Sequence, residues 1–216
     1  MKDLYSLNIK AVLFDMDGVV IDSEKLYSQS ESNVLAQYGV KFDDSDWHYI
    51  KGCTEKQFYD LVYSKFNPEV PRKKLMSQGR DFLKKLFSQK LEYMDGFRDI
   101  YPYLREKYKL ALVTSTGPEL FSHIDGLLSI YNNFDLVITS LDTKVHKPNP
   151  DPYIKAIKGL NVQANECIVV EDSIQGVKAG KAAGCIVVAL EGSIEKKFLV
   201  EADYIISSLY DIQNII

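Results

Sequence analysis

The segment 11–24, AVLFDMDGVVIDSE, limits the fold of this chain more than any other. Four apolar residues are followed at once by Asp15 and Asp17, so two carboxylates stand at the end of an expected buried strand. A strand that is apolar throughout is typical of a parallel sheet covered on both faces, and such sheets bind ligands beyond the carboxyl ends of their strands. We therefore expect chemistry at Asp15 and Asp17, although Asp and Gly are also common in turns and the motif alone does not exclude one.

Beyond residue 95 the chain alternates between strand and helix patterns. Apolar runs predict strands, and the amphipathic segments between them predict helices. The expected strands are 109–113, 136–139, 167–170, 186–189 and 204–206, and the expected helices are 100–107, 119–129, 152–158 and 175–183. Alternation of this kind gives right-handed crossovers between parallel strands. We therefore predict an α/β fold with a doubly wound parallel sheet.

The segment 23–94 differs from the rest of the chain. Its apolar spacing is helical at 23–38, 55–66 and 72–87, it shows no alternating strand pattern, and it is rich in lysine. This contrast predicts a helical insertion after the first strand. We expect a core domain formed by residues 1–22 and 95–216, and a helical cap domain, residues 23–94, that covers the first strand's carboxyl end as a lid.

The composition favours a protein whose partner is a small molecule. The 216 residues are 46% hydrophobic and 26% charged, which is ordinary for a globular protein. A net charge of −4 lacks the basic excess that nucleic-acid binding requires. No apolar run approaches the ~20 residues of a membrane span, and the three cysteines, Cys53, Cys167 and Cys185, lack metal-ligand spacing. We expect a reduced, cytoplasmic monomer without nucleic-acid or membrane partners.

Three further polar clusters come after apolar runs, at 114–116, at Lys147 and at 171–172. The hydroxyls of Thr114 and Ser115 can donate to a phosphate oxygen, although threonine after a strand is often only a helix cap. Lysine is usually exposed, but prolines at 148, 150 and 152 stiffen the loop that carries Lys147. The acidic pair is followed by a glycine-rich helix, whose small residues permit close packing on the sheet.

Taken together, these groups suit a magnesium ion and a phosphoryl group. Mg²⁺ prefers oxygen ligands, and the candidates are carboxylates at strand ends: Asp15, Asp17, Glu171 and Asp172. Lys147 and the Thr114 hydroxyl supply charge and hydrogen bonds for a phosphoryl group. A metal would also offset the repulsion between an anionic nucleophile and an anionic substrate.

In this order the motifs resemble those of the haloacid dehalogenase superfamily, specifically its beta-phosphoglucomutase-like phosphatase branch with a helical (C1-type) cap. DMDGVVIDSE is similar to the family's first motif, LVTST to its second, the lysine of HKPNPDPY to its third and VVEDSIQGVKAGKAAG to its fourth. ADYIISSLYDI resembles the family's closing strand and helix. The resemblance therefore covers the whole chain and implies a Rossmann-like core.

The resemblance implies a phosphoaspartyl mechanism. Asp15 attacks phosphorus, and Asp17 protonates the leaving oxygen and then activates water. Mg²⁺ is held by Asp15, the backbone carbonyl of Asp17 and Asp172, and Glu171 supports these ligands. Thr114 and Lys147 grip the transferring phosphoryl group. The acid at position 17 also argues against dehalogenation, which needs neither an acid there nor a metal.

The cap bears on the choice between a phosphatase and a phosphosugar mutase. The segment 50–57, IKGCTEKQ, resembles the mutases' specificity loop, so Gly52, Cys53 and Thr54 are candidate substrate contacts. The mutases' cap histidine is replaced by Tyr27 and their phosphate-binding arginine by Glu55, whose charge would repel a second phosphate.

Hydrolysis of a small phosphorylated metabolite, such as a sugar phosphate, is therefore the leading hypothesis. Mutase activity is the first alternative, and a catalytically silent binding protein on the same fold is the second. Arg80 and Lys56 are further candidate contacts to the substrate.

Overall fold

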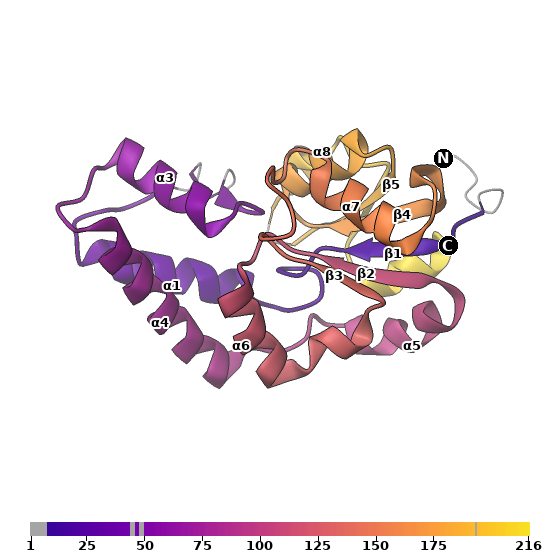
Figure 1. Ribbon diagram of the computed structural model, residues 1–216, viewed down its shortest axis with the longest axis horizontal. Coiled ribbons are helices and arrows are strands. Elements are labelled where there is room, and N and C mark those ends of the chain that lie inside the picture. Colours follow the sequence, from indigo (N-terminus) through magenta and orange to yellow (C-terminus); the bar gives the residue numbers. More distant parts are fainter. Residues whose placement is uncertain (1–7, 44–45, 48–49, 193) are drawn as a thin grey trace.

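The computed structural model describes residues 8–43, 46–47, 50–192 and 194–216, and it contains a six-stranded parallel sheet (Figure 1). The strands are β1 Ala11–Phe14, β2 Lys109–Val113, β3 Leu136–Ile138, β4 Cys167–Glu171, β5 Ile186–Leu190 and β6 Tyr204–Ile206. Their order in the sheet is β3-β2-β1-β4-β5-β6, so β1 pairs with both β2 and β4. The strand order reverses at β1, which is where a doubly wound sheet forms its ligand crevice. The predicted fold class is confirmed.

Helices cover both faces of the sheet (Figure 1). α5 Phe97–Lys107 and α6 Pro118–Leu128 lie on one face, and α7 Asp151–Leu160 and α8 Ile174–Ala182 lie on the other. All four residues of β1 are buried, because successive side chains enter the two opposite apolar clusters. Short 3₁₀ helices lie at Ile130–Asn133, Ala164–Glu166, Lys196–Phe198 and Leu209–Asn214.

The segment 23–94, the predicted cap, gathers apart from the sheet at the left of Figure 1. It contains α1 Glu24–Ala36, α3 Glu55–Lys65 and α4 Arg72–Lys90. These helices bury an apolar cluster of their own, which includes Val34, Phe58, Val62 and Leu75. No helix in the described part of the chain is both long and apolar enough to cross a membrane.

Both connections between the cap and the sheet pass through one pair of neighbouring segments. Ile21 forms an antiparallel bridge with Tyr93, and the N–H of Asp22 donates to the carbonyl of Glu92 at 3.0 Å. The N–H of Met94 donates to the carbonyl of Val20 at 2.9 Å. The chain therefore leaves the sheet and returns to it at a single narrow place.

Candidate active site

Lys147 lies at the centre of a buried charged cluster at the carboxyl end of the sheet. Its Nζ donates to Asp15 Oδ1 at 2.5 Å, to Glu171 Oε1 at 2.7 Å and to the backbone carbonyl of Val113 at 3.0 Å. Burial disfavours the ammonium charge, but the carboxylates of Asp15 and Glu171 outweigh burial and raise the pKa of Lys147. The lysine is therefore a fixed cation beside Asp15.

Glu171 orients this lysine. Its Oε1 also accepts from the hydroxyl of Tyr153 at 2.7 Å, and its Oε2 accepts from the hydroxyl of Ser173 at 2.9 Å. The N–H groups of Asp172 and Ser173 donate to Oε2 at 3.2 Å. With both oxygens occupied, Glu171 is fully hydrogen-bonded, which fits a role in positioning Lys147.

Among the residues that the structure describes, Asp15, Glu171 and Asp172 form a group that can hold a metal ion. Their carboxylate oxygens lie within 4.8 Å of one another, and all three side chains are buried. Gly18 has a φ of +78°, and a Cβ there would lie 2.1 Å from Asp172 Oδ2, so only glycine lets the backbone approach so closely. The oxygen-only ligands fit Mg²⁺. The Asp17 carboxylate is not part of this group.

Asp17 is held by two hydroxyl groups. Ser23 Oγ donates to one carboxylate oxygen at 2.7 Å and Thr116 Oγ1 to the other at 2.9 Å, while the Tyr27 hydroxyl lies 3.3 Å from Thr116 Oγ1. Burial raises the pKa of Asp17, although these hydroxyls lower it in part. A raised pKa suits a carboxyl group that gives and takes a proton.

The two hydroxyl residues directly after β2, Thr114 and Ser115, differ in position and in hydrogen-bond partner. Thr114 is buried, its Oγ1 accepts the N–H of Thr116 at 3.0 Å, and it does not line the cavity. Ser115 does line the cavity, and its hydroxyl donates to the carbonyl of Gly52 at 2.7 Å. Ser115 therefore links the core to the cap loop.

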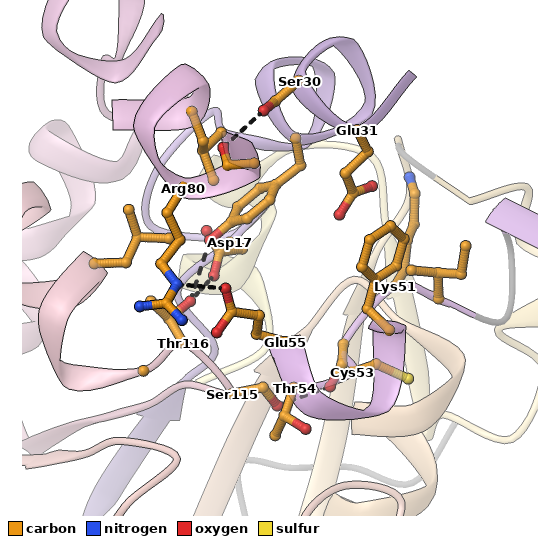
Figure 2. Close-up of a pocket in the computed structure, with 18 of the residues that line it drawn as sticks. Asp17, Ser30, Glu31, Lys51, Cys53, Thr54, Glu55, Arg80, Ser115 and Thr116 are labelled. Carbon is orange, nitrogen blue, oxygen red and sulfur yellow. Dashed lines mark hydrogen bonds and ion pairs between the residues drawn. The ribbon is translucent and has the colours of Figure 1, made fainter. Parts of the chain in front are cut away.

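A cavity of about 370 Å³ lies between the core and the cap (Figure 2). The sequence-predicted residues that line it are Asp15, Asp17, Gly52, Cys53, Thr54, Arg80 and Ser115. Thr54 begins α3 in a capping box with Gln57. Burial raises the pKa of the Cys53 thiol to about 11.

Arg80 and Lys56, the two basic cap residues expected near the substrate, differ in position. Arg80 lines the cavity and donates to Glu55 and to Glu119 on α6, each at 2.7 Å. Lys56 pairs with Asp60 at 2.7 Å, its side chain is 80% exposed, and it does not line the cavity. The structure does not support the expected contact of Lys56, because its i,i+4 partner turns it toward solvent.

Several residues of the site were not assigned from the sequence. Ser23 stands within the first motif, but nothing in the pattern shows that its hydroxyl reaches back to Asp17. Tyr153 follows three prolines in the third motif, and its contact with Glu171 depends on how α7 packs. Glu31 lies on the polar side of a helix pattern and could not be told from a solvated residue.

Comparison with known sequences identifies the family. The model of haloacid dehalogenase-like hydrolases matches residues 12–190. A phosphorylated carbohydrates phosphatase from Thermotoga maritima is 30% identical over 177 residues, 82% of either chain. Validoxylamine A 7'-phosphate phosphatase from Streptomyces hygroscopicus subsp. limoneus is 28% identical over 206 residues, 94% of this chain and 96% of that protein. 6-Phosphogluconate phosphatase from Escherichia coli is 27% identical over 179 residues, 82% of this chain and 80% of that protein.

Solved structures show the same architecture. A Thermotoga maritima protein provisionally assigned as a beta-phosphoglucomutase has a TM-score of 0.75 and 28% identity, covering 96% of this chain and 98% of that one. Beta-phosphoglucomutase from Clostridium difficile has a TM-score of 0.82 over 96% of both chains, and at 20% identity it shows the fold alone. Motifs, sheet order and family model agree, so the chain belongs to the haloacid dehalogenase-like hydrolases.

Proposed function

We propose that this chain is a Mg²⁺-dependent phosphatase that hydrolyses a small phosphorylated metabolite, such as a sugar phosphate, through a phosphoaspartyl intermediate. The observation that carries the proposal is the buried position of Lys147 between Asp15 and Glu171, together with the position of Asp15 and Asp17 in the wall of the cavity. Phosphatases of phosphorylated carbohydrates among the relatives support it. These relatives are named for different compounds, so they do not identify the substrate of this chain.

We assign a residue to each step of the proposed hydrolysis. Lys147 engages Asp15 Oδ1, so the other oxygen, Oδ2, attacks phosphorus and forms the acyl phosphate while the ester P–O bond breaks. Asp17 gives its proton to the leaving alkoxide. In the second half Asp17 takes a proton from water, the water oxygen attacks phosphorus, and phosphate leaves as the Asp15 carboxylate is regenerated.

We propose that Asp15, Asp172 and the backbone carbonyl of Asp17 hold Mg²⁺, with Glu171 supporting them. When bound there, the ion would offset the negative charge of the phosphoryl group. We assign to Lys147 a second positive charge that would hold the phosphoryl group, because its ammonium stays charged between two carboxylates. We also assign to Thr114 a hold on this phosphoryl group; its buried hydroxyl accepts the N–H of Thr116 at 3.0 Å in the loop after β2.

We propose that residues 23–94 act as a cap that closes over residues 1–22 and 95–216 and excludes water during the reaction. The hydrogen bond from Ser115 to Gly52 and the ion pair of Arg80 with Glu119 connect the two parts and support this proposal. We further propose a cytoplasmic monomer without nucleic-acid or membrane partners. The net charge of −4, which lacks a basic excess, supports the part of this proposal that concerns nucleic acid.

Hydrolysis is favoured over mutase activity by the two ion pairs of Arg80. A mutase must hold a second phosphate at the far end of its bisphosphate intermediate. Here Arg80, the basic side chain best placed for that task, is paired with Glu55 and Glu119. A second phosphate would have to displace two carboxylates, which like-charge repulsion opposes.

The test is turnover of p-nitrophenyl phosphate with and without EDTA. Asp15→Asn removes the nucleophile and is expected to lower kcat about a thousand-fold or more. Asp81→Asn, the same change at an exposed position of α4, serves as the control and should keep its activity. Undiminished turnover in Asp15→Asn contradicts the mechanism.

The two alternatives are tested separately. Hexose 1-phosphate supplied with a bisphosphate activator distinguishes the mutase, since formation of the 6-phosphate isomer without phosphate release would replace our proposal. The silent binding protein is favoured only if a panel of phosphorylated metabolites yields no phosphate.

A further inference from the structure

Glu31 is a cap carboxyl group that the proposed reaction does not use. It lies on α1, lines the cavity, and reaches toward the open middle of it (Figure 2). The side chain is partly buried, and no described residue donates a hydrogen bond to it or forms an ion pair with it. Burial, and then the nearby Glu24 carboxylate, raise the pKa of Glu31. A partly buried carboxyl group of this kind is stabilised most by hydrogen bonds that a bound molecule donates to it.

The other charged groups around the cavity are already engaged by protein. Lys51 lies 3.2 Å from Glu24, and Arg80 is shared between Glu55 and Glu119. Among the described residues, the carboxyl groups that line the cavity are Asp15, Asp17, Glu24, Glu31, Glu55 and Glu119, and the cations are Lys51 and Arg80. The cavity wall therefore carries more acidic than basic side chains.

The rest of the wall is suited to a monosaccharide-sized molecule. Phe58, Tyr59, Ile50 and Leu83 provide apolar surface, and the volume of about 370 Å³ is at the small end of the range for ligand pockets. In such a pocket a few polar groups determine which compound is accepted. Glu31 is the acid that remains available for that task.

We propose that Glu31 selects the substrate by its organic part, accepting phosphate esters that offer hydroxyl or ammonium donors and rejecting those that carry a second anionic group. This inference rests on the proposed phosphatase function. Hydroxyl and ammonium groups satisfy a carboxyl group by donating to it. A carboxylate or a second phosphate brings no donor, adds negative charge to a cavity wall in which acids outnumber cations, and finds those cations already paired.

The experiment compares kcat/KM for four esters in wild type, Glu31→Gln and Glu69→Gln. p-Nitrophenyl phosphate reports phosphatase activity, glucose 6-phosphate offers hydroxyls, glucosamine 6-phosphate adds an ammonium group, and 6-phosphogluconate adds a carboxylate. Glu69 is an exposed cap acid, so Glu69→Gln repeats the charge change away from the cavity. Glu31→Asp keeps the carboxyl group, and it is measured in place of Glu31→Gln if that variant does not fold.

Wild type is expected to prefer the two sugar phosphates over 6-phosphogluconate by about tenfold or more, a difference of ~1.4 kcal/mol. Glu31→Gln should shrink that ratio at least severalfold, mainly through KM, whereas Glu69→Gln and Glu31→Asp should keep it. If the ammonium group is the favoured donor, the ratio of glucosamine 6-phosphate to glucose 6-phosphate also falls in Glu31→Gln; if hydroxyls suffice, it does not change.

Equal turnover of 6-phosphogluconate and glucose 6-phosphate by wild type overturns this inference, as does an unchanged ratio in Glu31→Gln. In both cases p-nitrophenyl phosphate hydrolysis still supports the phosphatase. Absence of phosphate release from all four esters overturns the proposed function, and the inference with it.

Discussion

The Nζ of Lys147 lies 2.5 Å from Asp15 Oδ1, although 132 positions separate the two residues in the chain. Lys147 is 1% exposed, and its second carboxylate partner, Glu171, is fully buried. A buried charge is tolerated only when it is paired, so the fold depends on this contact as much as the proposed chemistry does.

Lys147→Ala is expected to destabilise the fold by about 3–5 kcal/mol, because two buried carboxylates lose their shared cation. Urea unfolding measures the change. Lys155→Ala is the control. The Nζ of Lys155 lies 3.2 Å from Asp142 Oδ1 in a largely exposed pair, so this substitution should lower the free energy of unfolding by no more than about 1 kcal/mol. Equal losses in the two variants would contradict the assigned role of Lys147.

Glu119→Gln is expected to loosen the cap. Glu119 on α6 accepts from Arg80 and Lys84 of α4, so one carboxylate joins the core to the cap. These side chains are partly exposed, and such pairs contribute up to about 1 kcal/mol at low salt. We predict that KM for a sugar phosphate rises roughly two- to fivefold at low salt and converges with wild type in 1 M NaCl, where charges are screened.

The control for this cap variant is Glu201→Gln. Glu201 forms an exposed 3.9 Å pair with Lys178, and both residues belong to the core. Its KM should follow wild type at every salt concentration. A salt-independent KM in wild type would show that the Glu119 pairs do not hold the cap closed.

Gly176→Ala is expected to disturb Glu171. A Cβ at position 176 would lie 1.7 Å from Glu171 Oε1, inside the buried network around Lys147. Overpacking of this kind costs about 1–3 kcal/mol, and kcat should fall because Lys147 is displaced. Gly126→Ala on α6 meets no atom within 4 Å and should instead stabilise by about 0.5–1 kcal/mol. Thermal unfolding and steady-state kinetics check both variants, and similar behaviour would contradict the packing argument.

Cys53 is expected to alkylate slowly at neutral pH. Burial raises the pKa of its thiol from 9.0 to about 11, so the reactive thiolate is scarce. The rate with iodoacetamide, corrected with Cys53→Ser, should keep rising about tenfold per pH unit between pH 8 and 10, whereas an ordinary thiol levels off near its pKa. A plateau of the rate below pH 9 would show that burial does not raise the pKa of the Cys53 thiol.

The core was largely predictable because its strands are continuous apolar runs. β2 and β6 begin and end where the sequence predicts. Helix ends were less predictable: α5 begins at Phe97 rather than residue 100, directly after Gly96, whose φ of +79° ends the preceding turn. α4 continues to Lys90 through polar residues that give no apolar signal.

The proximity of the charged residues was predictable where they follow strand ends. Asp15 and Asp172 come together because parallel strands deliver their carboxyl ends to one edge, and Lys147 reaches Asp15 from the loop between β3 and α7. What each hydroxyl does was not predictable. Ser115 binds a cap carbonyl and Thr116 binds Asp17, and both contacts depend on how separate elements pack.

The paired segments at 20–22 and 92–94 place the two ends of the cap about 5 Å apart, the spacing of neighbouring strands. A foreign helical module whose own ends meet at this spacing could be grafted there without lengthening the sheet or altering Asp15 and Lys147. Under the proposed function, an exchange of this kind would change which substrate is accepted and leave the proposed catalytic residues of the core in place.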